Sequence, residues 1–493
     1  MKVAVVGAGY AGLGTARMLL RCGFEVTVYD RAPDIGGVWS RTRRYPGLRT
    51  QNDKRTYAFS ELPMPEHYPQ WPDGEQVQQY LESYVEYFGL GPVLRLGTEV
   101  VTADLIDGPA WSLTLRPAGG GESTQEVFDH LVVANGVFSR PAVPVLAGRT
   151  QFEEAGGRVV ATSDFLDLED ARGRDVLVIG YGKSACDLAV AISDVASSTT
   201  VAARRLLWKM PRKVAGVLNY KYLILTRVGE ALFPYFRPSL REKILPGPGG
   251  RVGKGMLAGV QAIAVRQFRL RPLGLVPPGS FGEIARSTVS LVTEGFYERA
   301  ADGRLRVRRD VTVDELTAQE GRPHARLSDG ETLPADLVVC GTGFDQQVPF
   351  LAPEVIARLQ DEHGNFLLHR QILPPDVPAL SFAGYRSSFF CPLGSEIGAV
   401  WTAAYLLGGL RPPPAAQMRA DIDEKLRWIE KFSAGKHARG TSVIPFSMHD
   451  IDELLTDLRL DVGPLTKARQ WLLPVDPSAY RGIGTALLAR HGR

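Results

Sequence analysis

The chain has 493 residues, a formal net charge of +3 and a hydrophobic share of 44%. A length prior of roughly 100–200 residues per domain gives two to four domains, and the small positive charge excludes nucleic acid as the main partner. No apolar run reaches the roughly 18 residues that a membrane span needs. We therefore predict a globular protein without a membrane span.

The cysteine and histidine patterns bear on metal binding and on the cellular compartment. The eight histidines show no metal-binding spacing. An apolar strand begins at Val3 and a Gly-rich turn is complete by Gly12, so a cleaved signal peptide would remove this turn. We expect a cytoplasmic protein without a metal site. The chain has four cysteines, none close enough to another for a CxxC motif: Cys22, Cys186, Cys340 and Cys391.

The first predicted element group is a strand, a Gly-rich turn and a helix. Residues 2–12 read KVAVVGAGYAG, which places Gly7, Gly9 and Gly12 between an apolar strand and a helix. The first glycine permits a tight turn, the second lets the backbone approach a pyrophosphate, and the third lets the helix pack on the strand. A second strand, residues 25–30, ends in Asp30, 23 residues after Gly7. This is the position at which a carboxylate accepts from a ribose diol.

A second group of the same kind starts at residue 175. Its Gly-rich turn runs into a helix in which Ala185 replaces the third glycine, a tolerated variant. The next strand, residues 199–203, is followed by Arg204, 24 residues after Gly180. The residues that we expect to contact a dinucleotide here are Gly180, Gly182, Lys183, Ser184 and Arg204. As alternatives, Lys183 is a plain surface lysine and Arg204 is a solvated charge after a strand.

The two groups differ in charge at the ribose position. An acid repels a 2′-phosphate, whereas an arginine holds it by charge-assisted hydrogen bonds. Asp30 therefore suits FAD, whose adenosine ribose has a free 2′-hydroxyl, and Arg204 suits NADPH. The sequence predicts both cofactors in one chain.

Several further motifs carry a family resemblance over nearly the whole chain. These are DIGGVW (34–39), YPGLRT (45–50), YAFS (57–60), VVANG (132–136), RRLLWKMP (204–211), VVCGTGF (338–344) and a late helix from residue 396 to 405. Together they resemble the flavin-containing monooxygenases and the Baeyer–Villiger monooxygenases, which are class B flavoprotein monooxygenases. The resemblance implies additional FAD or NADPH contacts at Gly37, Val38, Trp39, Ala134 and Gly343, with Trp39 as a wall against the flavin.

Two positions depart from these families. Thr162 stands where both families place the histidine of a fingerprint before the second Gly-rich turn. Gln51 stands where Baeyer–Villiger enzymes have an aspartate and flavin-containing monooxygenases often have an asparagine. The missing acid favours oxidation of a heteroatom or less usual chemistry.

We predict an α/β fold with two Rossmann-like dinucleotide-binding domains, one for FAD and one for NADPH, and an inserted helical subdomain. The predicted segments are 1–145 for the first part of the FAD domain, 146–335 for the NADPH domain with an insertion at about 214–285, and 336–493 for the rest of the FAD domain and a helical tail. Residues 217–236 are expected to form a helix packed in the protein, with a membrane-surface helix as the alternative. Strands near 304–308 and 325–327 suggest a small β-meander.

The resemblance implies an NADPH-dependent flavin monooxygenase that inserts one O2-derived oxygen atom into a small organic substrate through a C4a-peroxyflavin. We expect N- or S-oxygenation, with Baeyer–Villiger oxidation of a ketone as the first alternative. Gln51 and Asn52 are the candidate catalytic amides, unless they only order their loop. An NADPH oxidase or electron-transfer flavoprotein, a flavin disulfide reductase and a non-catalytic flavin-binding protein stay open. The expected partners are the substrate and O2, and a homodimer is left open.

Overall fold

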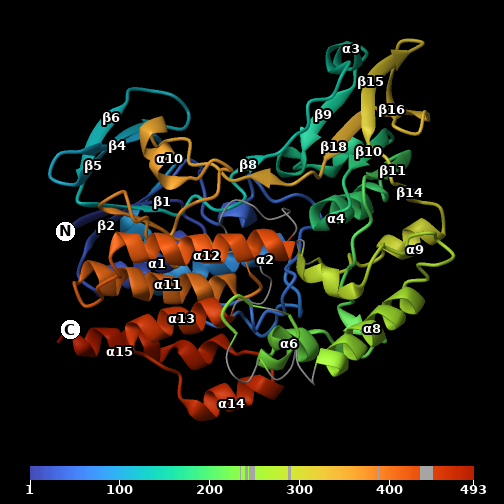
Figure 1. Cartoon of the computed structure of the whole chain (residues 1–493). Helices are drawn as coiled ribbons and strands as arrows, with labels where there is room; N and C mark the ends of the chain where they lie inside the picture. Colours follow the sequence, from blue (N-terminus) through green and yellow to red (C-terminus); the bar gives the residue numbers. More distant parts are fainter. Residues whose placement is uncertain are drawn as a thin grey trace.

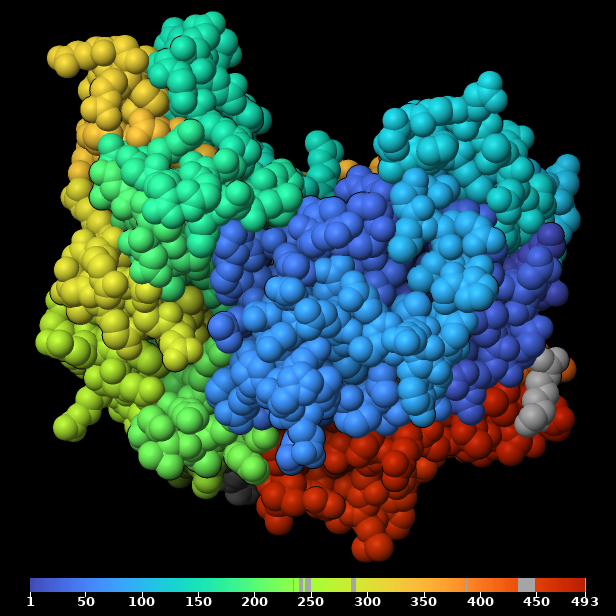
Figure 2. All heavy atoms as spheres, turned by 180° about the vertical axis from the view of Figure 1, so that it is seen from behind, coloured from blue at the N-terminus to red at the C-terminus, as the bar shows by residue number. Residues whose placement is uncertain are grey.

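The computed structural model describes residues 1–233, 235–238, 243, 250–286, 290–386, 388–433 and 448–492. Figure 1 shows two lobes that contain β-sheets and a layer of helices that lies beneath the first of them. The space-filling view from behind shows a broad notch between the second lobe and a small sheet on the first lobe, with the N-terminal segment as its floor (Figure 2).

The first lobe is built on a five-stranded parallel sheet with the order β20-β7-β1-β2-β3. Helix α1 (Tyr10–Arg21) follows β1 and packs on α11 (Cys391–Leu406). Because β20 comes from the last third of the chain, the C-terminal part completes the sheet that the N-terminal part begins. The strands are β1 (Lys2–Val6), β2 (Glu25–Asp30), β3 (Leu94–Leu96), β7 (His130–Val133) and β20 (Leu380–Phe382).

A second five-stranded parallel sheet forms the other lobe, in the order β14-β11-β10-β18-β9. Helix α4 (Lys183–Ile192) connects β10 to β11. Two parallel sheets with a crossover helix after the first strand confirm the predicted α/β class with two Rossmann-like units. The strands are β9 (Arg158–Ala161), β10 (Asp175–Ile179), β11 (Ser198–Ala203), β14 (Arg306–Arg309) and β18 (Leu337–Cys340).

Two three-stranded antiparallel sheets lie beside the parallel ones. The first, β4 (Thr98–Ile106), β5 (Ala110–Pro117) and β6 (Thr124–Phe128), forms the small sheet of the first lobe. The second, β15 (Val313–Gln319), β16 (Arg322–Leu327) and β17 (Thr332–Pro334), is the expected β-meander. The strand predicted at 304–308 is not part of it, because β14 pairs with β11 at the edge of the parallel sheet.

The predicted domain boundaries stay predictions, but one edge needs adjustment. Strand β18 pairs with β10 and β9 in the second sheet. A boundary at residue 335 would remove this strand from its sheet, so we propose that the NADPH domain extends to Cys340. Short strands β8 (Arg140–Pro141) and β19 (Phe344–Asp345) then pair where the chain passes between the lobes.

Residues 217–236 do not form the single helix that was expected. They begin in a hairpin, β12 (Lys213–Val214) with β13 (Leu218–Asn219), and continue as α5 (Lys221–Ile224) and α6 (Arg227–Ala231). Thr226 separates the helices: its backbone is extended and its side chain accepts a hydrogen bond from the Gly229 N–H, which caps the new helix. The Pro-Gly cluster at 246–249 lies outside the described residues.

The remaining helices lie around the sheets, above as well as below them in Figure 1. They are α2 (Gly74–Tyr87), α3 (Arg149–Glu154), α8 (Gly250–Gln267), α9 (Phe296–Ala301), α10 (Pro353–Leu359), α12 (Ala415–Ser433), α13 (Met448–Leu458), α14 (Pro464–Leu472) and α15 (Gly482–Arg490). Short 3-10 turns are η1 (Gly37–Trp39), η2 (Gly91–Val93), η3 (Thr162–Asp164), η4 (Leu168–Ala171), η5 (Phe281–Arg286) and η6 (Pro477–Tyr480). Within the described ranges, no helix combines the length and apolar character that crossing a bilayer requires, and no His, Cys, Asp and Glu cluster could hold a metal ion.

Candidate cofactor and active site

The first Gly-rich turn is closed by backbone contacts that exclude side chains. Gly7 has a φ of 122°, and a Cβ placed on it would lie 2.3 Å from the carbonyl oxygen of Ala134. A Cβ on Gly12 would lie 1.8 Å from the Gly7 oxygen. Both positions therefore require glycine for the packing of strand β1, helix α1 and the residue after β7.

Gly9 is different because the protein itself leaves room for a side chain there. It precedes α1 in an extended conformation, and an added Cβ would only reach ordinary contact, 3.5 Å from the Gly37 Cα. Packing within the protein therefore does not require glycine at this position. The free N–H groups at the start of α1 are of the kind that bind a pyrophosphate, so the predicted role of Gly9 stays a prediction.

Asp30 is held over the same turn. One carboxylate oxygen accepts from the Ala8 N–H at 2.8 Å and the other accepts from the Ala32 N–H at 2.9 Å. Burial raises the pKa of Asp30, and these two N–H donors oppose the increase. The side chain is fixed in one orientation, with further lone pairs available to a ribose diol.

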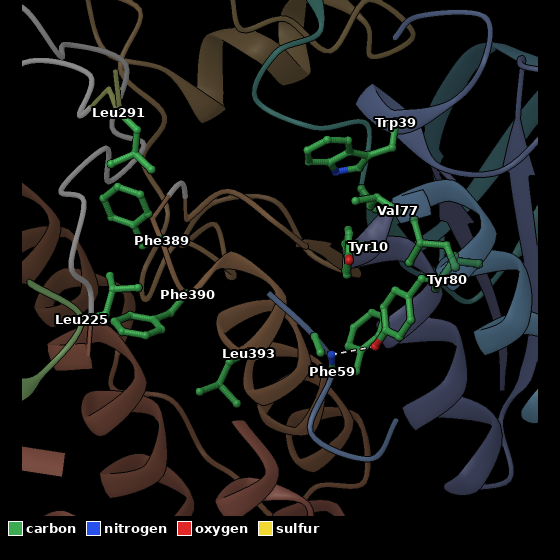
Figure 3. Close-up of a cluster of buried hydrophobic side chains, with 14 of the residues drawn as sticks. Tyr10, Trp39, Phe59, Val77, Tyr80, Leu225, Leu291, Phe389, Phe390 and Leu393 are labelled. Atoms are coloured by element: carbon green, nitrogen blue, oxygen red, sulfur yellow. Dashed lines mark hydrogen bonds between the residues drawn. The ribbon is translucent and has the colours of Figure 1, made fainter. Parts of the chain in front are cut away.

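The segment around Trp39 forms one wall of the site. The indole is 7% exposed and meets the Tyr57 ring edge-on at 5.7 Å. Its neighbour Val38 is 36% exposed. Figure 3 shows Trp39 and Tyr10 on one side of the close-up and Leu291 and Phe389 on the other. Trp39, Tyr10 and Phe389 belong to the first lobe and Leu291 to the second, so side chains of both lobes lie near one another here. The predicted role of Trp39 as a wall against the flavin stays a prediction.

The second Gly-rich turn has the same geometry as the first, except that alanine replaces the third glycine. Gly180 has a φ of 118°, and an added Cβ would lie 2.4 Å from the Gly341 oxygen. Ala185 occupies the third position, and a Cβ on Gly341 would lie 2.6 Å from its Cβ. Gly182 has open space around it, since a Cβ there would meet nothing within 4 Å. The turn is therefore open where a second pyrophosphate would approach.

Arg204 lies at the end of β11, where Asp30 lies at the end of β2. It is exposed, and none of its atoms has a hydrogen bond or ion pair to a described residue. The adjacent Arg205 differs, because it pairs with Glu283 at 3.3 Å. Arg204 thus has all its donors available for a phosphate.

Lys183 is not a surface lysine and does not extend freely from the turn. Its Nζ contacts Asp187 in the next turn of α4, and Asp187 also accepts from Thr293 Oγ1 at 2.5 Å and from the Tyr45 hydroxyl at 3.2 Å. Burial lowers the pKa of Lys183. Ser184 lies near the same Tyr45 hydroxyl. Tyr45 comes from the first lobe, so this buried cluster joins the two lobes.

Gln51 and Asn52 connect their loop to distant parts of the chain. The Gln51 side-chain oxygen accepts from the Leu291 N–H at 3.0 Å, and its carbonyl oxygen accepts from the Tyr220 hydroxyl at 2.7 Å. Asn52 is buried and its amide donates to the Phe389 carbonyl at 2.5 Å. These contacts support a loop-ordering role. They also leave the Gln51 Nε2 without an acceptor among the described residues, so it is available as a donor.

The structure adds residues to this loop that the sequence did not indicate. Asp53 is 3% exposed and accepts from Lys221 Nζ and Gln70 Nε2, both at 2.8 Å. Lys221 and Tyr220 lie 168 and 169 residues away from their partners. No local pattern predicts such pairs, although an acid next to Gln51 and Asn52 was visible in the sequence.

The remaining predicted positions lie near the lobe connections. Ala134 follows β7, and Gly343 has a φ of 94° and accepts from the Ala142 N–H at 3.0 Å. Thr162 is buried at 4% exposure in the turn after β9. Its single hydroxyl does not offer the two ring nitrogens of the histidine that the resemblance implies at this position.

Comparisons with known proteins agree with this geometry. The model of the flavin-binding monooxygenase-like family matches residues 1–245. A probable flavin-containing monooxygenase 1 of Arabidopsis thaliana is 24% identical, over 93% of this chain and 92% of that protein. The structure of S-allyl-L-cysteine S-oxygenase from Allium sativum matches with a TM-score of 0.62 at 19% identity, covering 99% and 97% of the two chains. Cyclohexanone monooxygenase from Rhodococcus sp. Phi1 bound to NADP+ matches with a TM-score of 0.68 at 18% identity, covering 93% and 97%.

Proposed function

The chain belongs to the flavin-binding monooxygenase-like family, and we propose that it uses FAD and NADPH to transfer one oxygen atom of O2 to a nitrogen or sulfur atom of a small molecule. The predicted family and enzyme class are confirmed by this membership. The predicted pair of cofactors is supported by structural neighbours that were solved with NADP+ or with FAD and NADP. The type of reaction and the residue roles below are the proposal.

The residues of the first lobe fit FAD. The turn between Gly7 and Gly12 offers helix N–H groups to the pyrophosphate, and Asp30 offers its carboxylate to the ribose. Trp39 and the segment around Phe389 exclude water from the flavin ring. Exclusion of water matters here because it keeps reduced flavin chemistry from ending in hydrogen peroxide.

The residues of the second lobe fit NADPH. We place the pyrophosphate at the open turn of Gly182 and the 2′-phosphate at Arg204. The Tyr45, Asp187 and Thr293 hydrogen bonds fix the second lobe against the first. Their role is to set the distance and angle between the two cofactors, which hydride transfer requires. Lys183 reaches a phosphate only if it leaves Asp187.

When bound and reduced by NADPH, FAD supplies the activation of O2. Where FAD would react with O2, the chain contributes the Nε2 of Gln51 as a hydrogen-bond donor. The Leu291 and Tyr220 contacts set the orientation of this residue. Asn52 uses its amide on the Phe389 carbonyl, which makes it a positioning residue.

The single observation that carries N- or S-oxygenation over ketone oxidation is the neutral Gln51. No negative charge stands at this position, and the neighbouring acid Asp53 is neutralised by Lys221 at 2.8 Å. A neutral donor suits transfer of oxygen to an electron-rich heteroatom, which needs no charged base.

The test is an incubation of the purified holoenzyme with NADPH and ¹⁸O2. Thioanisole, N,N-dimethylaniline and cyclohexanone serve as substrates, and products are measured by mass spectrometry. We expect ¹⁸O in the sulfoxide or N-oxide. A labelled lactone alone would establish Baeyer–Villiger chemistry, and NADPH consumption with hydrogen peroxide as the sole product for every substrate would establish an oxidase.

A further inference from the structure

Two buried or half-buried cations near the lobe interface lack an acidic partner. Lys209 is 4% exposed, and its Nζ donates to the Tyr181 carbonyl at 2.8 Å and to Ser290 Oγ at 3.3 Å, both uncharged. Arg212 makes no side-chain hydrogen bond or ion pair with any described residue, and its buried Nε has no partner. An unpaired buried donor is costly, so a native structure that retains one needs an explanation.

Among the described residues, no acid forms a hydrogen bond or ion pair with either cation, although the charge of Asp187 acts on Arg212. Asp187 is used by Lys183, Thr293 and Tyr45, and Asp53 is used by Lys221. Glu294, which also acts on Arg212, is exposed. The interface therefore carries an excess of buried positive charge, and Arg212 contributes the part that is accessible and unpaired.

The Arg212 guanidinium has a defined place. Its Cζ lies 4.9 Å from the centroid of the Trp71 ring, so the indole supports one face of the planar group. A guanidinium supported in this way keeps its edge donors free for a carboxylate. Trp71 belongs to the first lobe and Arg212 to the second, so the group lies between them.

Tyr220 links Arg212 to the proposed site of oxygen transfer. The Tyr220 N–H donates to the Arg212 carbonyl at 3.1 Å, and the Tyr220 hydroxyl donates to the Gln51 carbonyl at 2.7 Å. The Arg212 charge acts on that hydroxyl and opposes the rise in the pKa of Tyr220 that burial causes. The guanidinium thus lies beside the Gln51 loop.

We propose that Arg212 binds the carboxylate of an anionic substrate and makes the enzyme selective for acid-bearing sulfides or amines. This rests on the proposed function, because it assigns the substrate class of the same site. The edge of the guanidinium forms two parallel hydrogen bonds to the carboxylate, which holds the heteroatom toward Gln51. The coenzyme phosphates have their own donors at Gly182 and Arg204, at the start of α4 and the end of β11.

The test compares two probes that differ in one carboxylate, 4-(methylthio)benzoate and thioanisole. Binding to the oxidised holoenzyme is measured by the change in flavin absorbance and in tryptophan fluorescence, without NADPH or turnover. We expect the acid to bind more tightly than thioanisole. Arg212→Gln should weaken the acid by about 10- to 100-fold and leave thioanisole unchanged. Arg212→Lys should retain part of the preference, because it keeps the charge but not the two-pronged geometry.

Arg251→Gln is the matched control, since it removes the same charge from an exposed site on α8. Equal binding of both probes by the wild type, or equal weakening of both in Arg212→Gln, would overturn the proposal. Weaker NADP+ binding with unchanged acid binding would assign Arg212 to the coenzyme and also overturn it. If Arg212→Gln does not retain FAD, the acid-to-thioanisole ratio of Arg212→Lys decides. Selective acid binding without any sulfoxide would instead contradict the proposed function alone.

Discussion

In the first dinucleotide-binding unit, a Cβ on Gly7 would lie 2.3 Å from the carbonyl oxygen of Ala134, and in the second a Cβ on Gly180 would lie 2.4 Å from that of Gly341. The φ angles of the two glycines, 122° and 118°, are also nearly equal. The backbone that faces a pyrophosphate is therefore the same in both units. The differences lie one turn into the helix and at the end of the second strand.

One turn into the helix, the two units differ in which of two facing residues is alanine and which is glycine. The first has Gly12 opposite Ala134, and the second has Ala185 opposite Gly341. In each pair one residue is glycine and the other is alanine, so each unit has a single methyl group between the helix and the segment that faces it. The missing third glycine of the second motif is thus replaced by a glycine 156 positions later.

At the end of the second strand, the units differ in charge and in mobility. Asp30 is fixed by two N–H donors at 2.8 and 2.9 Å, whereas Arg204 is exposed and unpaired in the part of the chain that the structure describes. A preformed acceptor suits a cofactor that stays bound, and a free cation suits a coenzyme that is exchanged in each cycle. This contrast gives the predictions below.

The largest effect is expected at Gly12. Gly12→Ala places a Cβ 1.8 Å from the Gly7 oxygen, which the turn can only accept by moving apart, at a cost of about 3 kcal/mol. The purified variant should contain little or no FAD by absorbance at the flavin band and should have a lower thermal midpoint.

Two other glycines are controls for this result. Gly182→Ala should fold with normal FAD content, because its Cβ meets no protein atom within 4 Å. Gly9→Ala should also fold, since its Cβ reaches only ordinary contact at 3.5 Å, yet it should lose FAD because the methyl group occupies the pyrophosphate position. Full flavin content in Gly9→Ala would remove the first turn from the cofactor site.

Arg204 should show the next largest effect. Arg204→Ala removes the exposed, unpaired cation at the end of β11, and loss of one charge-assisted contact costs about 1.5–3 kcal/mol, or roughly 10–150-fold. The KM for NADPH should rise by this factor while that for NADH stays nearly constant. Equal increases for both coenzymes would mean that Arg204 does not contact the 2′-phosphate.

In the second unit, the glycine and the alanine of the facing pair can be swapped by mutation. Gly341→Ala should destabilise the protein by about 1–3 kcal/mol, because its Cβ would lie 2.6 Å from that of Ala185. Adding Ala185→Gly recreates the pairing of the first unit and should recover part of the loss. Denaturant unfolding of both single variants and the double variant measures the coupling. Additive losses would show that these two residues do not act as a pair.

The two parallel units could be predicted from the sequence because each signal is local. Gly7, Gly12 and Asp30 lie within 24 residues, and their spacing alone defines a strand, a turn, a helix and an acid. The same holds for Gly180 to Arg204. The family resemblance extended the prediction of the fold to nearly the whole chain and placed Trp39 and Ala134 in the first unit.

The interface between the units could not be predicted in this way. Gln51 meets Tyr220 and Leu291 across 169 and 240 residues, and Tyr45 meets Asp187 across 142. These pairs depend on how the two lobes pack, which no periodicity in one segment encodes. Likewise, the break at Thr226 follows from a side-chain cap that an apolar run conceals.

A pH effect is expected in the first unit, on the face of helix α1 that packs against α11. Helix α1 is covered by α11, where Glu396 accepts from the Ser60 N–H and hydroxyl, both at 2.8 Å, and burial raises the pKa of Glu396 to about 7. The folded protein then binds a proton that the unfolded chain releases, so stability falls as the pH rises from about 5 to about 7.

The expected change in the free energy of unfolding is about 1–2 kcal/mol, reduced by partial solvent access. Thermal midpoints across this range measure it. Glu396→Gln should flatten the profile, because the amide keeps the hydrogen bonds without the titration. An unchanged slope in this variant would assign the pH dependence to another group.

The smallest effect concerns Gln51, whose loop in the first lobe contacts Tyr220 and Leu291 of the second. If its Nε2 is the donor that favours oxygen transfer, Gln51→Ala should leave flavin reduction by NADPH almost unchanged, since the turns at Gly7 and Gly180 stay intact. The yield of oxygenated product per NADPH should fall a few-fold and hydrogen peroxide should rise. Gln51→Glu is the matched variant: it keeps the oxygen that accepts from the Leu291 N–H at 3.0 Å but loses the donor, so it should be uncoupled to the same extent. Stopped-flow absorbance separates reduction from the reaction with O2. If Gln51→Glu stays fully coupled while Gln51→Ala does not, the Leu291 contact is what matters, and Gln51 orders the loop between the lobes without acting on the reaction.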